Sequence, residues 1–413
     1  WKLGEIIYER CIKAGVNKKE CDERKIKTQQ IVVDRGRTGV NAISNLTERD
    51  KLDSGQCRDC FSPAMNYVPG GSAQYGMALT KFKDDGSKHR FKYGFISSSD
   101  NHQAAPGSGY KELFHTSVDG VGPPNELFDK FLHMEPYTVG ATNENPVKDA
   151  YISDDQPIDF DLTKLTLGFN TIEWERQRSF FQTGGLAAVH SEGRSKEEIW
   201  DAFKRHETYA TSGPRILLWF DLVNNQDGTN RKSPMGSLVE MSQNPEFEVR
   251  AMGSYIQKSG CPEDAYTALG EDRVNELCYN ECYNPSDERK KITRIEVIRV
   301  WPQEYMNQPI DERIEDTWLV HNCDTDKIGC RFTFTDPDFS TMQSDVSYYA
   351  RAIEEPSPII NVKGAHCIFD EEGNCSEFKI CTQDFKNPRD LEECTSIDEP
   401  RAWSSPIYLN YKS

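Results

Sequence analysis

The chain has 413 residues, with 67 Asp and Glu against 49 Lys and Arg, and a formal charge of −18 at pH 7. That acidic balance excludes a nucleic-acid binder, because binding phosphates requires a basic face. No apolar run approaches the roughly 18 residues of a membrane span, and the 11% of aromatic residues argues against disorder. At this length we expect two or three domains, each with its own core.

The N-terminal ninety residues predict short helices and loops. Apolar residues share one helical face between Leu3 and Ala14, which predicts a helix there. Residues 91–99 alternate like a strand, with Phe91, Tyr93 and Phe95 on one side. Residues 103–170 follow as a long stretch punctuated by Pro and Gly. So long an irregular stretch inside a compact domain indicates a lid or a binding wall.

The clearest local pattern predicts a helix that begins after Ser195. Glu198 stands three residues beyond this serine, so the two form a capping box that satisfies the first free backbone N–H groups. Apolar residues then line one face, and we expect the helix to end near Thr208. A turn follows, and residues 215–222 predict a strand.

Beyond Gly213 the apolar period changes from helical to two. Short strands separated by turns and cysteine loops are predicted in "FEVRAMG", "ITRIEVIRVW", "CRFTFTD", "DVSYYARAI" and "SPIYLNY". This pattern is typical of an antiparallel β-sandwich. We therefore expect a domain boundary near Gly213, with residues 1–212 in one domain and residues 213–413 in a disulfide-rich β-sandwich.

Asp100 and His102 directly follow the strand predicted over residues 91–99. Side chains at i and i+2 of an extended segment point the same way, so these two offer an oxygen and an imidazole nitrogen to one point. Such donors suit zinc, manganese or iron. The alternative is a turn aspartate that caps backbone amides beside an exposed histidine.

A family resemblance favours the metal site. "FKYGFISSSDNHQAAPGSGYKE" resembles the last metal motif of the PHP superfamily, the polymerase and histidinol phosphatase hydrolases. "GGLAAVHSEGRSKEEIWDAFKRHETYATSGPRI" resembles the helix and exit strand that follow that motif in an exported branch, the domain of unknown function 3604 family. The likeness continues through "NECYNPSDERKKITRIEVIRV" and "RAWSSPIYLNY", and thus covers the chain from about Gln56 to its end.

The resemblance implies a distorted barrel of parallel strands and helices, with two or three divalent metal ions at the carboxyl ends of the strands. Asp100 and His102 are then the last ligands. The superfamily's first motif, His-x-His, does not occur among the eight histidines. The chain therefore looks like the C-terminal part of such a protein, and we expect an upstream segment or a companion chain to complete both barrel and metal site.

Three further residues are candidates for the rim of that site. Lys111 follows the glycines of "APGSGYK", whose backbone N–H groups could meet an anionic small-molecule substrate. His115 and Arg194 are the other two. A turn is the simpler interpretation of the glycines, and a solvated surface role is the simpler one for His115 and Arg194. His190 lies in an apolar run and is interpreted as structural.

The 13 cysteines indicate an oxidising compartment, periplasmic or extracellular. Local spacing predicts four disulfides, namely Cys11–Cys21, Cys323–Cys330, Cys367–Cys375 and Cys381–Cys394. The odd count leaves one thiol that is either free and buried or bonded to a missing part. The partners of Cys57, Cys60, Cys261, Cys278 and Cys282 stay open. Zinc would need Cys57 and Cys60 together with Cys278 and Cys282, and disulfides are the simpler expectation for these four.

Two functions compete on these observations. The first is a metal-dependent hydrolase of PHP type that acts on a phosphoester or a related ester. The second is a non-catalytic extracellular scaffold or binding protein whose barrel site has degenerated. In the first, the sandwich packs against the barrel and offers contacts for a homo-oligomer. An intact upstream His-x-His favours the enzyme, and its loss favours the scaffold.

Overall fold

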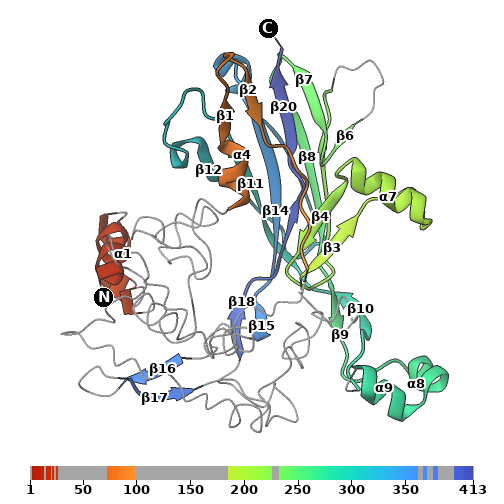
Figure 1. The fold of residues 1–413 in the computed structure, drawn as a ribbon. Helices are drawn as coiled ribbons and strands as arrows, with labels where there is room; N and C mark the ends of the chain where they lie inside the picture. The colour runs from red at the N-terminus through yellow and green to blue at the C-terminus, as the bar shows by residue number, and fades with distance from the viewer. Residues whose placement is uncertain are drawn as a thin grey trace, which may run out of the picture. The chain divides into compact units, whose positions relative to one another are not determined.

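A computed structural model describes residues 2–13, 15–19, 21–22, 25–26, 72–98, 185–225, 232–278, 280–360, 366–369, 375–379 and 395–412 (Figure 1). Its helices are α1 (Lys2–Lys13), α4 (Ala73–Ala78), α7 (Lys196–Lys204), α8 (Glu263–Leu269), α9 (Glu271–Cys278), α10 (Phe339–Met342) and the 3-10 turn η4 (Asp311–Arg313). Its first strands are β1 (Thr80–Phe82), β2 (Lys88–Arg90), β3 (Leu186–Val189), β4 (Thr208–Thr211), β5 (Leu217–Leu222), β6 (Ser233–Pro234), β7 (Leu238–Met241), β8 (Glu246–Met252), β9 (Tyr255–Gln257) and β10 (Pro285–Arg289). The remaining strands are β11 (Ile292–Val300), β12 (Ile314–Asn322), β13 (Cys330–Thr335), β14 (Val346–Glu354), β15 (Ser357–Ile360), β16 (His366–Phe369), β17 (Cys375–Lys379), β18 (Thr395–Asp398), β19 (Arg401–Ser404) and β20 (Ile407–Tyr411).

The chain divides into two compact units. The first contains residues 1–76, 121–182 and 360–396, and the second contains residues 77–120, 183–359 and 397–413. In the second unit, an eight-stranded sheet has the order β12-β11-β14-β19-β4-β3, and β20 joins β14 to β7. A four-stranded sheet has the order β13-β8-β5-β6. β20 and β7 run parallel, whereas the other registered pairs of these two sheets are antiparallel.

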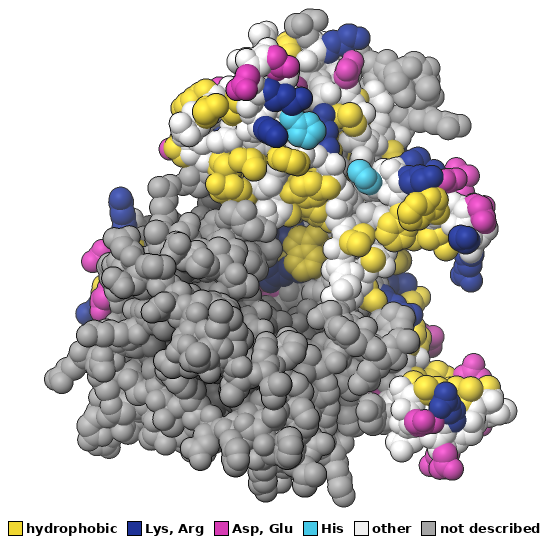
Figure 2. Space-filling model, viewed as in Figure 1, with side chains coloured by type: hydrophobic (Ala, Val, Ile, Leu, Met, Phe, Trp, Pro, Cys, Tyr) yellow, Lys and Arg dark blue, Asp and Glu magenta, His cyan; other side chains and the backbone are white. Residues whose placement is uncertain are grey.

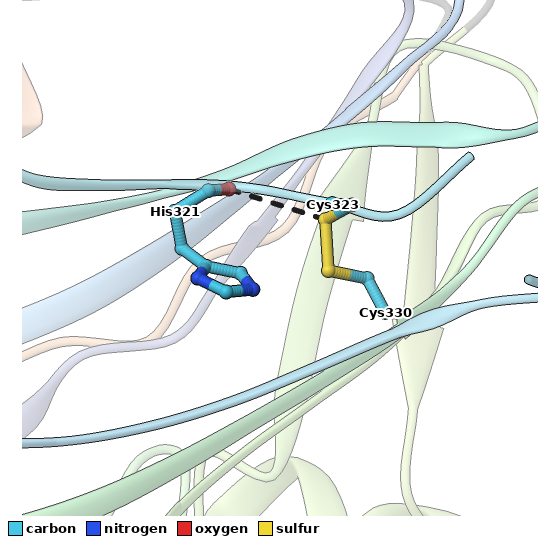
Figure 3. A group of neighbouring side chains, drawn as sticks. All are labelled: His321, Cys323 and Cys330. Atoms are coloured by element: carbon cyan, nitrogen blue, oxygen red, sulfur yellow. Dashed lines mark hydrogen bonds between the residues drawn. A yellow bond between two sulfur atoms is a disulfide. The ribbon is translucent and has the colours of Figure 1, made fainter. Parts of the chain in front are cut away.

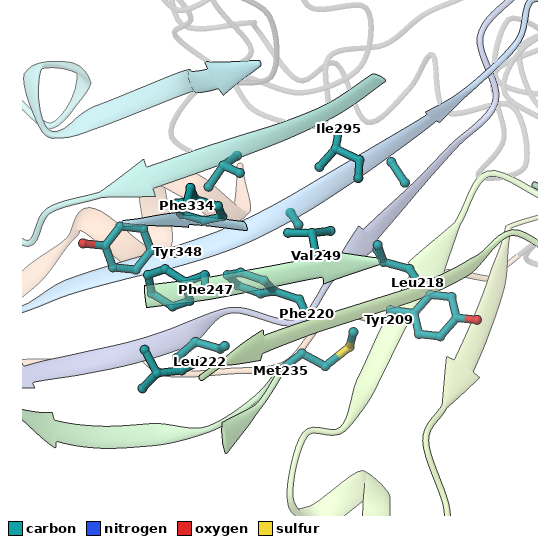
Figure 4. Close-up of a cluster of buried hydrophobic side chains, with 14 of the residues drawn as sticks. Tyr209, Leu218, Phe220, Leu222, Met235, Phe247, Val249, Ile295, Phe334 and Tyr348 are labelled. Carbon is teal, nitrogen blue, oxygen red and sulfur yellow. The ribbon is translucent and has the colours of Figure 1, made fainter. Parts of the chain in front are cut away.

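The main core of the second unit lies between these two sheets (Figure 4). Phe247 on β8 packs at its centre, with ring centroids 5.3 Å from Phe220, 5.1 Å from Phe334 and 4.7 Å from Tyr348. Tyr348 belongs to the eight-stranded sheet and the other three rings to the four-stranded sheet. The two sheets are therefore held face to face by buried aromatic surface, which is the main favourable term in folding.

The strands predicted after Gly213 are found. The five quoted stretches correspond to β8, β11, β13, β14 and β20, and residues 217–222 form β5. α1 is found where apolar spacing predicted it. The described fold mixes helix and strand, its sheets are mostly antiparallel, and none of the described sheets closes into a barrel. β3 and β4 precede Gly213 yet share a sheet with β11 and β14, so the division into residues 1–212 and 213–413 stays a prediction.

The helix predicted after Ser195 is α7, and its capping box is present. Glu198 N–H donates to Ser195 Oγ at 3.2 Å, and Ser195 N–H donates to Glu198 Oε2 at 3.0 Å. The helix ends at Lys204, earlier than the expected Thr208, because His206 adopts a left-handed φ of 58°. This conformation turns the chain directly into β4. Among the described helices, no stretch is both long and apolar enough to cross a membrane.

Candidate functional site

Residues 91–98 are the described part of the strand predicted over 91–99, and they form no ladder with a described strand. Tyr93 N–H donates to the Tyr408 hydroxyl at 3.0 Å, and that hydroxyl donates to Tyr93 O at 3.0 Å. Phe95 N–H donates to Ser405 Oγ at 2.8 Å. Among the described residues this segment is therefore not a paired strand, and side-chain hydroxyl groups hold Tyr93 and Phe95; pairing with another polypeptide stays a prediction.

Packing explains why the alternation misled the prediction. Tyr93 and Phe95 do share one side, and the Phe95 ring meets Tyr349 of β14 edge-on at 5.2 Å. Burial raises the pKa of Tyr93 to about 12. β14 is paired on both edges, so a segment lying across it meets side chains rather than free backbone groups. Figure 1 shows this segment running from β2 along the sheet.

Ser97 anchors the far end of the segment between β3 and β4. Its Oγ lies 2.7 Å from Leu186 O and 2.8 Å from Thr211 O, and it accepts from Thr211 N–H at 3.2 Å. Gly185 permits the close approach, because a Cβ there would lie 2.9 Å from Ser98 O. The residues just before Asp100 are thus fixed at one edge of the eight-stranded sheet.

Four of the predicted site residues lie outside the described residues: Asp100, His102, Lys111 and His115. Arg194 is described and is exposed in the turn before α7. The structure therefore fixes the approach to the predicted ligands and one residue of the predicted rim. It brings no two of the five candidates together within the described ranges.

The donor chemistry of Asp100 and His102 fits a zinc, manganese or iron ion. Among the described residues, one group offers three metal-ligating atoms within 4.8 Å of one another: His321, Cys323 and Cys330 (Figure 3). A disulfide joins its two cysteines, so no thiolate is available to a metal. The His321 ring stacks on Phe332 with centroids 4.4 Å apart. This group therefore acts as a covalent link between β12 and β13.

Cysteine pairing is confirmed where its sulfur atoms are described. Cys11–Cys21 and Cys323–Cys330 are disulfides, as predicted from their spacing. A third disulfide, Cys261–Cys282, closes the base of α8 and α9 and leaves Cys278 unbonded. Zinc held by Cys278 together with Cys282 is thereby excluded. The side chains of Cys57, Cys60, Cys367, Cys375, Cys381 and Cys394 lie outside the described set.

His190 has the structural role that its apolar surroundings indicated. One ring nitrogen lies 2.8 Å from Leu218 O, and the ring packs against Tyr209 at 5.4 Å and Trp219 at 5.7 Å. Burial raises the pKa of Tyr209 to about 12. The imidazole therefore joins the end of β3 to β5.

Asp221 and Glu248 form a carboxylate pair that the sequence did not reveal. They face each other on β5 and β8, and both are nearly buried. Lys232 Nζ lies 2.5 Å from Glu248 and 3.9 Å from Asp221, and Arg250 lies 3.5 Å from each. Burial raises the pKa of Asp221, whereas the hydrogen bond from Lys232 lowers the pKa of Glu248. Since cations surround both carboxylates, the pair links neighbouring strands of the four-stranded sheet.

A cavity of about 700 Å³ opens beside the C-terminal end of α7. Its walls come from Arg205 and Glu207, from Asn225 and Ser233, from residues 238–242, and from Lys412. Periodicity could not predict it, because four separate stretches of chain supply these residues. The lining combines apolar side chains with charges of both signs, and Figure 2 likewise shows hydrophobic and charged side chains together around α7.

Comparison with known proteins gives one match. The profile of the family described as "Protein of unknown function (DUF3604)" matches residues 58–268, a little over half of the chain. No curated protein matches the chain, and no solved structure matches it. The likeness predicted beyond residue 268 stays a prediction. The segment at 91–98, α7 and all the cavity residues except Lys412 fall within the matched region, and the chain belongs to the DUF3604 family.

Proposed function

We propose that this protein is an exported, metal-dependent hydrolase of PHP type that acts on a phosphoester or a related ester. The observation that carries the proposal is that Asp100 and His102 follow two and four residues after an anchored segment that ends at Ser98. Ser97 bonds to both β3 and β4, and Ser98 packs on Gly185. Because Ser97 and Ser98 are anchored to the sheet, the chain that leads to the two ligands starts from a fixed position. Metal binding requires ligands that are held in place in this way.

In this proposal Asp100 and His102 hold a divalent ion through a carboxylate oxygen and an imidazole nitrogen. Bound metal would lower the pKa of a water molecule and neutralise charge that develops on the ester. Lys111, His115 and Arg194 would bind the anionic substrate. Remaining ligands for a site of two or three ions come from residues outside the described ranges or from another polypeptide.

The test combines metal analysis with hydrolysis of 4-nitrophenyl phosphate and bis(4-nitrophenyl) phosphate. Asp100→Ala and His102→Ala should each remove bound zinc, manganese or iron and abolish hydrolysis. Asp84→Ala and His89→Ala are matched controls, because both residues are exposed around the β1–β2 hairpin, and they should change neither result. Metal content that survives both site variants would exclude these residues as ligands.

A second candidate function is a non-catalytic extracellular scaffold. The three described disulfides and the two sheets with an aromatic core support it, because such cross-links suit a protein that persists in an oxidising compartment. In this version residues 213–413 form a β-sandwich with a structural role. Folded protein without metal and without hydrolysis, in the assay above, would favour the scaffold.

A further inference from the structure

One edge of strand β7 has backbone groups without a strand partner among the described residues. β7 pairs with β20, where Tyr408 N–H donates to Ser237 O at 2.9 Å and Lys412 N–H donates to Met241 O at 3.0 Å. Backbone groups alternate in direction along a strand, so residues 237, 239 and 241 face β20. Leu238 and Glu240 therefore direct their N–H and C=O groups to the opposite side.

The cavity of about 700 Å³ lies along this edge, since residues 238–242 line it without a break. Arg205 and Glu207 form its wall at the end of α7, and Asn225 and Ser233 also border it. An edge strand that is fully exposed to solvent could pair with the edge of a second sheet. Because residues at the end of α7 form a wall beside β7, this edge lies in a groove that has room for one extended segment.

The walls of the groove are fixed before any ligand arrives. Arg205 donates to Glu207 through Nε at 2.8 Å and through a terminal nitrogen at 3.2 Å. Gly236, with a φ of 88°, makes the turn into β7 and lies so close that a Cβ would sit 2.2 Å from His206 O. Helix end and strand start are thus packed backbone to backbone, and a preformed groove loses little entropy on binding.

The exposed side chains of β7 define the chemistry of the occupant. Leu238 is 55% exposed and Glu240 is exposed, and both point to the same face of the strand. An added strand would place its own side chains directly opposite these two. The best match is an apolar residue beside Leu238 and a basic residue, two positions along, beside Glu240. The charge of −18 on the whole chain favours a basic partner as well.

We infer that the β7 groove binds an extended segment of a partner polypeptide in which every second residue is in turn apolar and basic, so that both kinds lie on the face shared with Leu238 and Glu240. The segment adds as a strand to the edge of β7, and the groove-facing N–H and C=O groups of Leu238 and Glu240 supply the hydrogen bonds. The site uses neither Asp100 nor His102 and needs no metal. It adds a polypeptide-binding surface to the proposed hydrolase or scaffold.

The first test uses a fluorescein-labelled ten-residue peptide in which valine and lysine take turns at every second position, with threonine between them, measured by fluorescence anisotropy against the full chain. Methylating the backbone nitrogens that face β7 should weaken binding at least tenfold, about the value of one lost hydrogen bond. Methylating the other set of nitrogens should leave binding within about threefold. Equal effects of the two sets, or no binding of the parent peptide, would overturn the inference.

Protein variants give an independent test. Leu238→Pro removes a groove-facing N–H while sparing the bonds to β20, because proline is tolerated where an edge N–H faces outward. It should weaken peptide binding about tenfold, whereas Leu238→Val should not. Glu240→Lys should weaken the valine–lysine peptide and strengthen a valine–glutamate peptide. A peptide of the same composition without alternation should bind poorly to wild-type protein. Concentration-dependent dimerisation that Leu238→Pro abolishes would assign the groove to a second copy instead.

Discussion

Strand β14 and the segment at residues 91–98 lie against each other in the same unit, but they are held in different ways. All nine residues of β14 are buried, and the strand pairs with β11 on one edge and with β19 and β20 on the other. Residues 91–98 form no such ladder with any described strand. Hydroxyl groups of Tyr408, Ser405 and Ser97 make hydrogen bonds that hold this segment.

The comparison indicates that β14 mainly stabilises the fold, whereas residues 91–98 mainly position the chain that leads to Asp100. A backbone ladder depends little on which side chains it carries, so β14 can hold Arg351 and Glu354 in its interior. Hydroxyl contacts depend on single side chains, so the approach to Asp100 can be altered by one substitution without dismantling the sheets. Four predictions test this contrast, in order of decreasing effect.

Arg351→Met should have the largest effect. Its guanidinium donates to Glu296 at 2.6 Å and to Asp316 at 3.1 Å, and its side chain is only 3% exposed. Removing it takes the buried guanidinium from between two carboxylates, of which Glu296 keeps its ion pair with Arg294, so the free energy of unfolding in urea should fall by up to about 3–5 kcal/mol. Arg331→Met is the control, because Arg331 pairs with Glu248 but is 69% exposed, and it should cost less than about 1 kcal/mol. Equal losses would contradict the importance of burial.

Ser97→Ala should have an intermediate and local effect. The substitution leaves Thr211 N–H without its hydroxyl acceptor, which should lower the free energy of unfolding by about 1–3 kcal/mol. Hydrogen exchange should accelerate at residues 91–98 and at Thr211 more than in β14. Ile96→Ser is the control, since Ile96 is 60% exposed beside the anchor. Uniform acceleration across the sheet would show that Ser97 serves global stability instead.

Tyr408→Phe should loosen the other end of the segment. The lost hydroxyl both accepts from Tyr93 N–H and donates to Tyr93 O, so we expect a loss of about 1 kcal/mol. The ring stays buried, and the core packing is retained. Hydrogen exchange at the Tyr93 amide is the direct measurement. Unchanged protection there would show that the Tyr408 hydroxyl does not hold this segment.

Glu354→Gln should have the smallest effect and a pH dependence. Burial raises the pKa of Glu354, against hydrogen bonds from Ser254 that lower it, and Lys290 and Glu355 are the charged groups nearby. As pH rises from about 4.5 through the raised pKa, the folded state holds the proton longer and the stability contributed by this group falls.

Glutamine does not ionise, so the stability of the variant relative to the wild type should increase as the pH rises through the raised pKa of Glu354. The gain should reach a plateau in the free energy of unfolding near neutral pH, once wild-type Glu354 has lost its proton in the folded state. Glu355→Gln is a half-buried neighbour that serves as the control. A stability difference that does not change with pH would refute the assignment.

Local chemistry was predictable from the sequence. The start of α7 follows from Ser195 and Glu198 alone, and β8, β11, β13, β14 and β20 follow from alternation. The end of α7 was not predictable, because His206 takes a left-handed conformation that glycine usually signals. The conformation of residues 91–98 was not predictable either. Phe91, Tyr93 and Phe95 alternate in the same way in a paired strand and in a segment that lies across a strand.

Long-range features were beyond the sequence. Cys261 and Cys282 meet because two helices return the chain to its starting point, which their spacing does not indicate. The β7 groove depends on α7, β6 and β20 converging on one edge. Asp100 and His102 could be proposed from their spacing and from a family likeness, and their geometry stays a prediction.

The positions of β19 and β20 bear on how the protein is made. These strands, residues 401–411, fill the gaps between β14 and both β4 and β7. On the ribosome, β4, β7 and β14 emerge long before β19 and β20. Until β19 and β20 emerge, the edges with which they pair have unpaired backbone groups. Such late, distant pairing is slow and exposes nascent chains to mispairing. Synthesis that stopped even a dozen residues short of Tyr411 would leave the sheet split down its middle.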